Sequence, residues 1–166
     1  MSSHAAVHPD RFREALASWA GGVTVVTTRH AGLVYGITVS SFSSLSLDPL
    51  LVLVCLQNSN RLAGMIQEAR RFGVSILAEK QDDVARWFAV SGREPIPAFE
   101  DFPTVEMATG SPIIAGAIAQ IDCTLEQALP GGDHTIMVGR VVGAGSDPHQ
   151  RPLLYFRRTY RTLDVD

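Results

Sequence analysis

Hydrophobic and polar positions follow two different periods along the chain, and each period predicts one type of element. The first is helical: after Asp10, a candidate N-cap, apolar residues occupy the i, i+3, i+4 and i+7 positions of one helix face, namely Phe12, Ala15, Leu16 and Trp19. The pair Gly21-Gly22 ends this helix. We expect its apolar face to pack on the core as the first element of the fold.

Strand-like segments come next, and they outnumber the helices. β-Branched residues over 23–28, a turn at 30–32 and a second run over 33–40 predict a hairpin. The nearly all-aliphatic run 50–56 is typical of a strand that is buried on both faces. Further strands are predicted over 72–78, 113–129, 135–142 and 153–156.

Two more helices and one long connection lie between these strands. Residues 58–60 open an amphipathic helix that Arg70-Arg71 closes, with apolar positions at Leu62, Met65, Ile66 and Ala69. A shorter helix begins at Asp82 and Asp83 and carries Val84, Trp87 and Phe88. The segment 91–112 contains four prolines and little periodicity, so we interpret it as a long loop and a candidate lid.

The order of these elements predicts the fold class. The longest strand pairs are joined by turns too short for a helical crossover, which favours a small antiparallel β-barrel with a few flanking helices over a doubly wound parallel sheet. A chain of 166 residues has room for one core. We expect a flexible N-terminal tail over residues 1–9 and a single domain over 10–166.

Composition narrows the class of partner. Hydrophobic residues make up 46% of the chain and charged residues 19%, below the ~25% typical of soluble domains, which favours a buried subunit interface and an oligomer. A net charge of −3 gives no electrostatic footprint for nucleic acid or an anionic membrane. The chain shows neither a signal-peptide pattern nor an apolar run of about 18 residues, so we expect a cytoplasmic protein.

Metal and thiol chemistry are not expected. Cys55 and Cys123 lie in apolar surroundings without a CxxC pair, which predicts two buried thiols. His4 and His8 have the spacing of a helical metal pair, but Pro9 follows at once and no feature of the tail favours a helix there. The GxGxxG, P-loop, GxSxG and HExxH motifs are absent from the sequence.

A run rich in hydroxyl groups is the first candidate for a binding site. Six of the nine residues over 38–46 are Ser or Thr. Such residues favour solvated loops, but they can also face a ligand rich in hydrogen-bond acceptors from the edge of an apolar cleft. Both interpretations remain open at this point.

Three further segments each allow a plain and a functional interpretation. Asn58-Ser59-Asn60-Arg61 places free N–H groups and a cation at a helix start, where Arg61 is either exposed or paired with a bound anion. Gly131-Gly132-Asp133-His134 is either an ordinary hairpin turn or a close approach to a flat ring beside His134. Residues 152–161 interleave aromatic and cationic side chains, as an edge strand or a stacking surface does.

In combination, these segments resemble the short-chain flavin reductases that are the small components of two-component flavin-dependent monooxygenases. The resemblance extends from Phe12 to Tyr160, and it rests on the order and spacing of FREALASWAGGVTVVTT (12–28), GITVSSFSSLSLDPLLVLVCL (36–56), NSNR (58–61), GSPII (110–114), IDC (121–123), GGDH (131–134) and PLLYFRRTY (152–160). It implies a homodimeric, flavin-binding split β-barrel of Greek-key type. Asp48-Pro49-Leu50 departs from a Pro-Pro pair often seen at this place.

The resemblance also implies roles for individual residues. The flavin ring, ribityl chain and phosphate would contact Gly36, Ile37, Thr38, Ser40, Ser41, Cys55, Leu56, Gln57, Asn58, Ser59, Asn60 and Arg61. The nicotinamide would lie near Asp133, His134, Tyr155 and Arg157, with His134 as the catalytic residue. The cofactors implied are FAD or FMN, bound without a covalent link, and NADH or NADPH as co-substrate.

The function implied is an NAD(P)H:flavin oxidoreductase that passes hydride to the flavin and supplies reduced flavin to a separate monooxygenase. Two alternatives remain. One is a split-barrel flavoprotein that keeps its flavin as an electron carrier or sensor, and the other is an enzyme like pyridoxine-phosphate oxidase. Whether the flavin is FAD or FMN, and whether it is released at each turnover, stays open.

Overall fold

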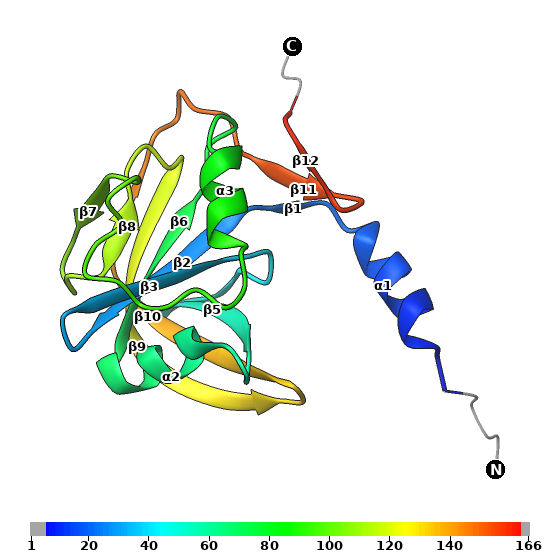
Figure 1. Ribbon diagram of the computed structural model, residues 1–166, viewed down its shortest axis with the longest axis horizontal. Coiled ribbons are helices and arrows are strands. Elements are labelled where there is room, and N and C mark those ends of the chain that lie inside the picture. Colours follow the sequence, from blue (N-terminus) through cyan, green and yellow to red (C-terminus); the bar gives the residue numbers. More distant parts are fainter. Residues whose placement is uncertain (1–5, 164–166) are drawn as a thin grey trace.

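Over residues 6–163, which the computed structural model describes, the chain folds into antiparallel sheets with three short helices (Figure 1). The helices are α1 (Pro9–Ala17), α2 (Arg61–Ala69) and α3 (Asp82–Phe88). The strands are β1 (Gly21–Gly22), β2 (Thr24–His30), β3 (Leu33–Val39), β4 (Ser43–Leu47), β5 (Leu50–Gln57), β6 (Arg71–Ile76), β7 (Thr104–Glu106), β8 (Pro112–Ile114), β9 (Ala119–Gly131), β10 (His134–Ser146), β11 (Leu154–Phe156) and β12 (Thr159–Arg161).

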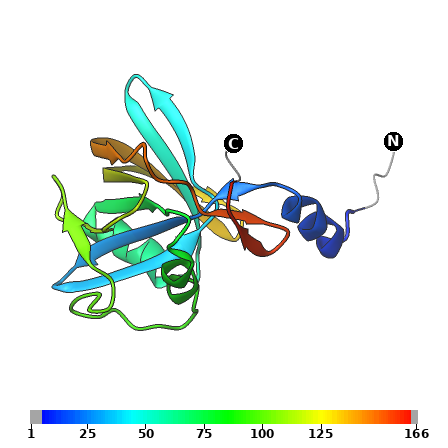
Figure 2. The same cartoon turned by 90° about the horizontal axis from the view of Figure 1, so that it is seen from above.

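The main sheet has seven strands in the order β3-β2-β6-β9-β10-β5-β4, and all neighbours are antiparallel. The sheet curls, so that the chain just after β3, at one edge of the sheet, comes close to β5, which lies next to the opposite edge (Figure 2). Ser41 Oγ makes the connection, since it donates to the Cys55 carbonyl at 2.9 Å and accepts from the Cys55 N–H at 3.0 Å. The expected mainly β, antiparallel fold with a few helices is confirmed.

Two apolar clusters form the core. In the first, Leu62 and Ile66 from α2 pack on the sheet against Phe72 and Met137, and all four side chains are fully buried. In the second, Phe88 from α3 packs with other buried side chains that include Leu77, Phe99 and Ile114. For α2 and α3, the apolar face that the sequence predicts is therefore the face that covers the sheet.

Two strand predictions need correction. The strand β5 is fully buried on one face only, because Val52, Val54 and Leu56 are buried while Leu51, Leu53 and Cys55 on the opposite face are only partly buried. Buried and partly buried residues alternate along β5 because no second layer in the described part of the chain covers the face opposite the core. The predicted strand 113–129 is two strands: β8 pairs with β7, and Gly116, at φ +72°, turns the chain before β9.

The helix α1 differs from the sequence prediction both in its N-cap and in its packing. His8 rather than Asp10 caps it, with the Asp10 N–H donating to His8 Nδ1 at 3.3 Å. No residue of α1 is buried, and the helix projects away from the sheet (Figures 1 and 2). The expectation that it packs on the core is wrong within one chain, because the backbone of β1 leads away from the sheet face it would need to cover. His4, the other member of the candidate metal pair, lies outside the described residues.

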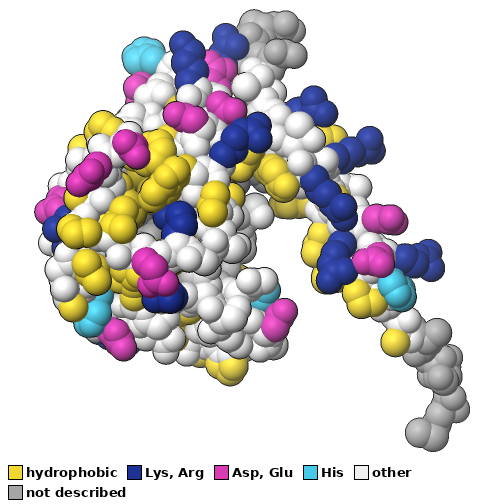
Figure 3. Space-filling view, in the orientation of Figure 1, with side chains coloured by type: hydrophobic (Ala, Val, Ile, Leu, Met, Phe, Trp, Pro, Cys, Tyr) yellow, Lys and Arg dark blue, Asp and Glu magenta, His cyan; other side chains and the backbone are white. Residues whose placement is uncertain are grey.

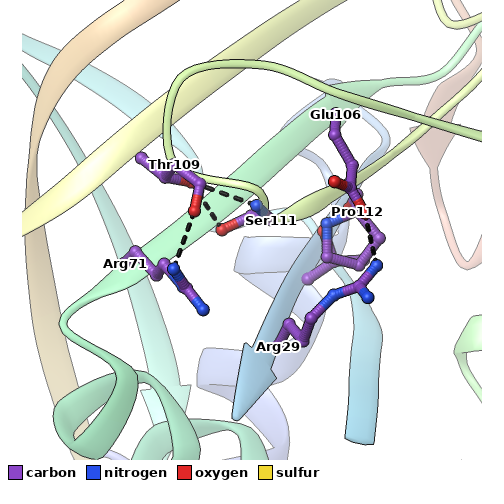
Figure 4. A network of polar contacts seen from close by, with 7 residues as sticks. Arg29, Arg71, Glu106, Thr109, Ser111 and Pro112 are labelled. Carbon is purple, nitrogen blue, oxygen red and sulfur yellow. Dashed lines mark hydrogen bonds and ion pairs between the residues drawn. The ribbon is translucent and has the colours of Figure 1, made fainter. Parts of the chain in front are cut away.

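The predicted lid is anchored by a polar network at its C-terminal end (Figure 4). Arg71 Nη1 donates to the Thr109 carbonyl at 2.8 Å, and the Thr109 N–H and hydroxyl both donate to the buried carboxylate of Asp122, at 2.6 and 2.5 Å. Arg29 forms an ion pair with Glu106. This part of the segment 91–112 is a packed part of the fold rather than a free loop, because its backbone groups are bonded to the sheet.

The two thiols differ in burial. Cys123 is fully buried, and this burial, with the neighbouring Asp122 carboxylate, raises the pKa of its thiol to about 12. Cys55 is half-buried, so the expectation of two buried thiols is correct only for Cys123. None of the helices within residues 6–163 has the length and apolar character to cross a membrane.

The tight packing between β10 and its neighbours gives a first prediction. A Cβ on Gly139 would lie 2.5 Å from Phe72 Cζ and 2.9 Å from Cys123 Cβ. Gly139→Ala should therefore lower the free energy of unfolding by about 1–3 kcal/mol, the usual cost of overpacking a core. Urea denaturation followed by circular dichroism measures this change.

Gly145→Ala on the same strand is the matched control, because the nearest atom to its Cβ would be 4.0 Å away. We expect this variant to keep at least wild-type stability, since Ala loses less backbone entropy than Gly. Equal stability of the two variants would contradict the close packing at Gly139.

Candidate functional site

A cavity of about 320 Å³ lies where the curled sheet brings the ends of β3 and β5 together. The start of α2 and the chain after α3 form its other sides. Its lining residues are Ile37, Thr38, Val39, Ser40, Ser41, Cys55, Leu56, Gln57, Asn60, Phe88, Ala89, Val90, Ser91 and His134. Nine of the residues singled out from the sequence therefore share one cavity, although they come from three separate segments of the chain.

The hydroxyl groups at this site serve mainly to join its walls. Thr38 Oγ1 donates to the Ala85 carbonyl at 2.7 Å and so attaches β3 to α3, while Ser41 bonds to Cys55 in both directions. Ser40 also lines the cavity, and its hydroxyl has no hydrogen-bond partner among residues 6–163. The remaining serines of the run lie on or beside β4 and outside the lining. The row of hydroxyl donors expected from the sequence is thus reduced to one free group.

The start of α2 and the turn before β10 are joined by Asn58. Its Oδ1 accepts from Thr135 Oγ1 at 2.8 Å, its Nδ2 donates to the Gly132 carbonyl at 3.2 Å, and its backbone N–H donates to the Asp133 carbonyl at 3.0 Å. The strand register places His134 directly opposite Gln57. Two motifs more than 70 residues apart in the sequence therefore form one edge of the cavity, with Asn58 as their connection rather than as part of the lining.

His134 is oriented by its neighbour. The distance between His134 Nδ1 and Asp133 Oδ1 is 2.7 Å, and this hydrogen bond holds the pKa of the exposed Asp133 carboxyl below its ordinary value. The carboxylate fixes Nδ1 as the protonated nitrogen, so the rest of the ring is available to the cavity that it lines. His134 is placed to contact a bound ring, and Asp133, which does not line the cavity, orients the imidazole through its hydrogen bond.

Arg61 has a carboxylate partner that the sequence did not indicate. Its guanidinium contacts Glu94 at 2.6 and 2.7 Å, using both nitrogens and both carboxylate oxygens. Both side chains are exposed, and the pair connects the start of α2 to the chain beyond α3, next to the cavity residue Asn60. An anion that binds at this helix start would compete with Glu94 for Arg61.

Arg93 supports the cavity wall formed by residues 88–91, which the sequence did not predict. Its guanidinium lies over the Trp87 ring at 4.1 Å and donates to the carbonyls of Gly36 at 2.7 Å and Phe88 at 3.3 Å. Burial lowers the pKa of this guanidinium. These contacts of Arg93 hold residues 88–91 against β3. Gly36, which was expected to contact the flavin, bonds to Arg93 through its carbonyl and is absent from the cavity lining. The prolines of the following loop were the signal for a functional segment nearby.

Two of the predicted nicotinamide residues lie apart from His134. Tyr155 lines a smaller hollow of about 190 Å³ that shares Thr38, Val39, Ser40 and Ala89 with the main cavity. Arg157 lines a third hollow, between α1 and the sheet, that also reaches Ser40 and Ser41. Tyr155 and Arg157 thus line hollows that adjoin the main cavity at Ser40, whereas His134 lines the main cavity itself. Ser59, also predicted to contact the flavin, is exposed and outside all three linings.

The exposed surface of the cavity is more polar than apolar, and Ser40, Gln57 and His134 contribute polar groups to it. Leu56 and Phe88 are fully buried, so they support the cavity wall and expose almost no surface to a ligand. The volume of the cavity is at the lower end of the range of small-molecule sites. No set of three or more side chains suited to bind a metal ion occurs between residues 6 and 163.

Comparison with known proteins agrees with this geometry. A family model described as a flavin reductase like domain matches residues 16–164. The reductase subunit of a flavin-dependent monooxygenase from Rhodococcus jostii is 38% identical over 161 residues, which are 97% of this chain and 81% of that protein. An NADH-dependent flavin reductase from a Rhodococcus species is 36% identical over 162 residues, which are 96% of this chain and 89% of that protein.

Solved structures show the same fold. The flavin reductase component of a bacterial two-component tryptophan halogenase has a TM-score of 0.89 and 37% identity, covering 96% of this chain and all of that one. The NADH:FAD oxidoreductase of Streptomyces globisporus, solved in complex with NAD and FAD fragments, has a TM-score of 0.89 and 32% identity, covering 98% of this chain and 99% of that one. The chain described here therefore belongs to the family of flavin reductase-like domains.

Proposed function

We propose that this protein is an NADH-dependent flavin reductase that releases reduced flavin to a separate monooxygenase. The observation that carries the proposal is the single cavity between β3, β5, α2 and residues 88–91, with a mostly polar exposed lining that includes one histidine. Relatives described as reductase subunits of monooxygenases and as an NADH-dependent FAD reductase support the same reaction class. A homodimer in the cytoplasm is part of the proposal.

The residues present fit a flavin at this site. Ile37 and Val90 offer apolar surface to the ring system, and the backbone around Ser40 and Ser41 offers donors to its polar edge. The phosphate would lie at the start of α2 beside Arg61, where it would compete with Asn60 for the N–H groups of Leu62 and Ala63 and with Glu94 for the guanidinium. FAD or FMN would be held without a covalent link.

When both are bound, the flavin and the nicotinamide supply the chemistry, a hydride transfer from nicotinamide C4 to flavin N5. The chain needs no nucleophile and no strong acid or base for this step. Its contribution is to hold two flat rings in contact, to exclude water, and to place donors where negative charge develops on the reduced ring. His134, oriented by Asp133, would position the nicotinamide from the β10 side.

Turnover with free flavin tests the proposal directly. With a large excess of FAD or FMN, NADH oxidation should continue for many flavins per chain, because a reductase releases its product. A flavin-retaining electron carrier would stop after about one equivalent, and an enzyme like pyridoxine-phosphate oxidase would consume no NADH with any flavin. Comparing NADH with NADPH, and FAD with FMN and riboflavin, identifies the preferred pair.

The ion pair of Arg61 gives a prediction about the phosphate. Arg61→Ala should weaken the binding of FMN or FAD by about 1 kcal/mol, a low value for a charged hydrogen bond because the side chain is exposed. Riboflavin, which has no phosphate, should bind equally well to wild type and variant. Flavin fluorescence titration measures all three affinities.

Glu94→Gln is the matched control, because it removes the competing carboxylate and leaves Arg61 in place. This variant should bind phosphorylated flavins at least as tightly as the wild type. Equal losses for riboflavin and FMN in Arg61→Ala would refute the phosphate role.

His134 gives a prediction about the nicotinamide. If the ring orders the nicotinamide and transfers no proton, His134→Ala should raise the KM for NADH and slow flavin reduction by roughly 10- to 100-fold, as positioning losses do. Flavin affinity should change little. Stopped-flow reduction at varied NADH, run beside a flavin titration, measures both quantities.

A loss of about 10⁴-fold would instead indicate proton transfer at this position. Unchanged kinetics would leave His134 as an ordinary strand residue, and the nicotinamide contacts would then have to be sought on the side of Tyr155 and Arg157.

A further inference from the structure

The chain between α3 and Ile96 forms one wall of the cavity and is attached to the rest of the fold at few points. Residues 88–91 line the cavity. Farther along, Ile96 pairs with Val34 of β3 through backbone hydrogen bonds of 2.7 and 3.1 Å. Between these two places, the side chains of Arg93 and Glu94 make the contacts with other elements that the described part of the chain contains. The position of the wall therefore depends on these two side chains.

Of the two attachments, that of Arg93 is the stronger. The ion pair at the start of α2 is exposed, and exposed ion pairs contribute little to stability. Arg93 is half-buried, and its Nη2 donates to the carbonyls of Gly36 at 2.7 Å and Phe88 at 3.3 Å. Its Nε donates to the Val90 carbonyl at 3.2 Å. One guanidinium thus connects β3, just before its cavity residues, to the wall formed by residues 88–91.

Stability alone does not explain an arginine at this place. The Lys and Arg side chains that Figure 3 shows lie mainly on the projecting arm and along the rim of the body. The Arg93 guanidinium instead lies 4.1 Å from the centre of the Trp87 ring, and no carboxylate in the described part of the chain pairs with it. Partial burial of an unpaired charge costs free energy that an apolar side chain on Trp87 would avoid. Arginine adds a flat fork of donors that stacks on a ring and also reaches several carbonyls.

The residue before Arg93 aims it at the wall. Gly92 has a φ of +76°, a backbone conformation that other residues rarely adopt, and a Cβ at Gly92 would have no atom within 4 Å. Glycine is therefore needed for the direction of the chain and not for lack of space. The turn at Gly92 brings the Arg93 side chain back to the carbonyls of Phe88 and Val90.

We propose that Arg93 is a positioning residue for flavin reduction, which sets the separation between residues 88–91 and the segment 37–41 and so the fit of the flavin ring. This inference rests on the proposed reductase function and deepens it. Arg93 does not line the cavity, so it acts through the two walls and not on the flavin itself. Because hydride transfer needs the two rings in contact, a displaced wall should weaken ring binding and slow the transfer. Recognition of the phosphate at Arg61 should not change.

Arg93→Met tests this role, because methionine keeps apolar cover on Trp87 and loses all three hydrogen bonds. Riboflavin and FMN should both bind about 10-fold more weakly, by the same factor, because the ring is common to both and its site is no longer pre-organised. Reduction of the bound flavin at saturating NADH should slow by roughly 10-fold. Fluorescence titration and stopped-flow kinetics measure these changes. Arg61→Ala should differ, since it should affect FMN alone.

Arg86→Met is the matched control, because it makes the same substitution on α3 at an exposed arginine that pairs with Asp82. This variant should bind riboflavin as tightly as the wild type. A merely structural role would lower the thermal midpoint of Arg93→Met and leave both riboflavin affinity and the reduction rate of the folded protein unchanged. That result would overturn the positioning role.

A second pair of variants keeps the test valid if Arg93→Met folds poorly. Gly92→Ala keeps the guanidinium and strains the backbone that aims it. Gly32→Ala, in the β2–β3 turn, is its control, because Gly32 has a φ of +79° and equally open space but lies at the end of β3 away from the cavity. Both variants should lose similar stability, and only Gly92→Ala should weaken riboflavin binding. Equal riboflavin affinities in the two variants would contradict the proposal.

The outcome is separable from the proposed activity. A wild type that reduces flavin, with an Arg93→Met variant of equal riboflavin affinity and rate, would overturn this role and leave the reductase function standing. A wild type that binds flavin through Arg93 but never oxidises NADH would support the role in ring binding and refute the function. A wild type that binds no flavin would overturn both.

Discussion

The pairing of β10 with β9 on one side and β5 on the other determines where the cavity forms. This strand is long and antiparallel to both neighbours, and its register sets His134 opposite Gln57 at the end of β5. The same curl brings the chain after β3 back to β5, where the Ser41 hydroxyl bonds both backbone groups of Cys55. Without this closure, the end of β3 would stay at one edge of the sheet, away from the paired ends of β5 and β10, and no cavity would lie between them.

The polar side chains around the cavity are used largely to hold its walls. Thr38 is bonded to α3, Asn58 to the turn before β10, Ser41 to β5, and Arg93 to the carbonyls of Gly36 and Phe88. This use follows from burial, because polar groups removed from water need partners. The surface left for a ligand is more polar than apolar and includes Ser40, Gln57 and His134. None of these groups has to act as a nucleophile in a reaction between two cofactors whose own atoms exchange the hydride.

Large apolar side chains are exposed in two separate parts of the chain. The arm formed by α1 and the hairpin of β4 and β5 both project from the body, and both expose large side chains. The proposed homodimer would offer cover for such surfaces, in agreement with the low charge content of the sequence.

Most of the local structure, and the family, could be predicted from the sequence alone. The β2–β3 hairpin, the Asn60 cap of α2 and the turn before β10 depend on neighbouring residues, and the order of short motifs indicated flavin reductases. Tertiary structure decided the rest: Glu94 as the partner of Arg61, residues 88–91 as a cavity wall, Tyr155 apart from His134, and α1 without a core. Periodicity and capping report on contacts within a few residues, whereas these features depend on how a curled sheet brings distant segments together.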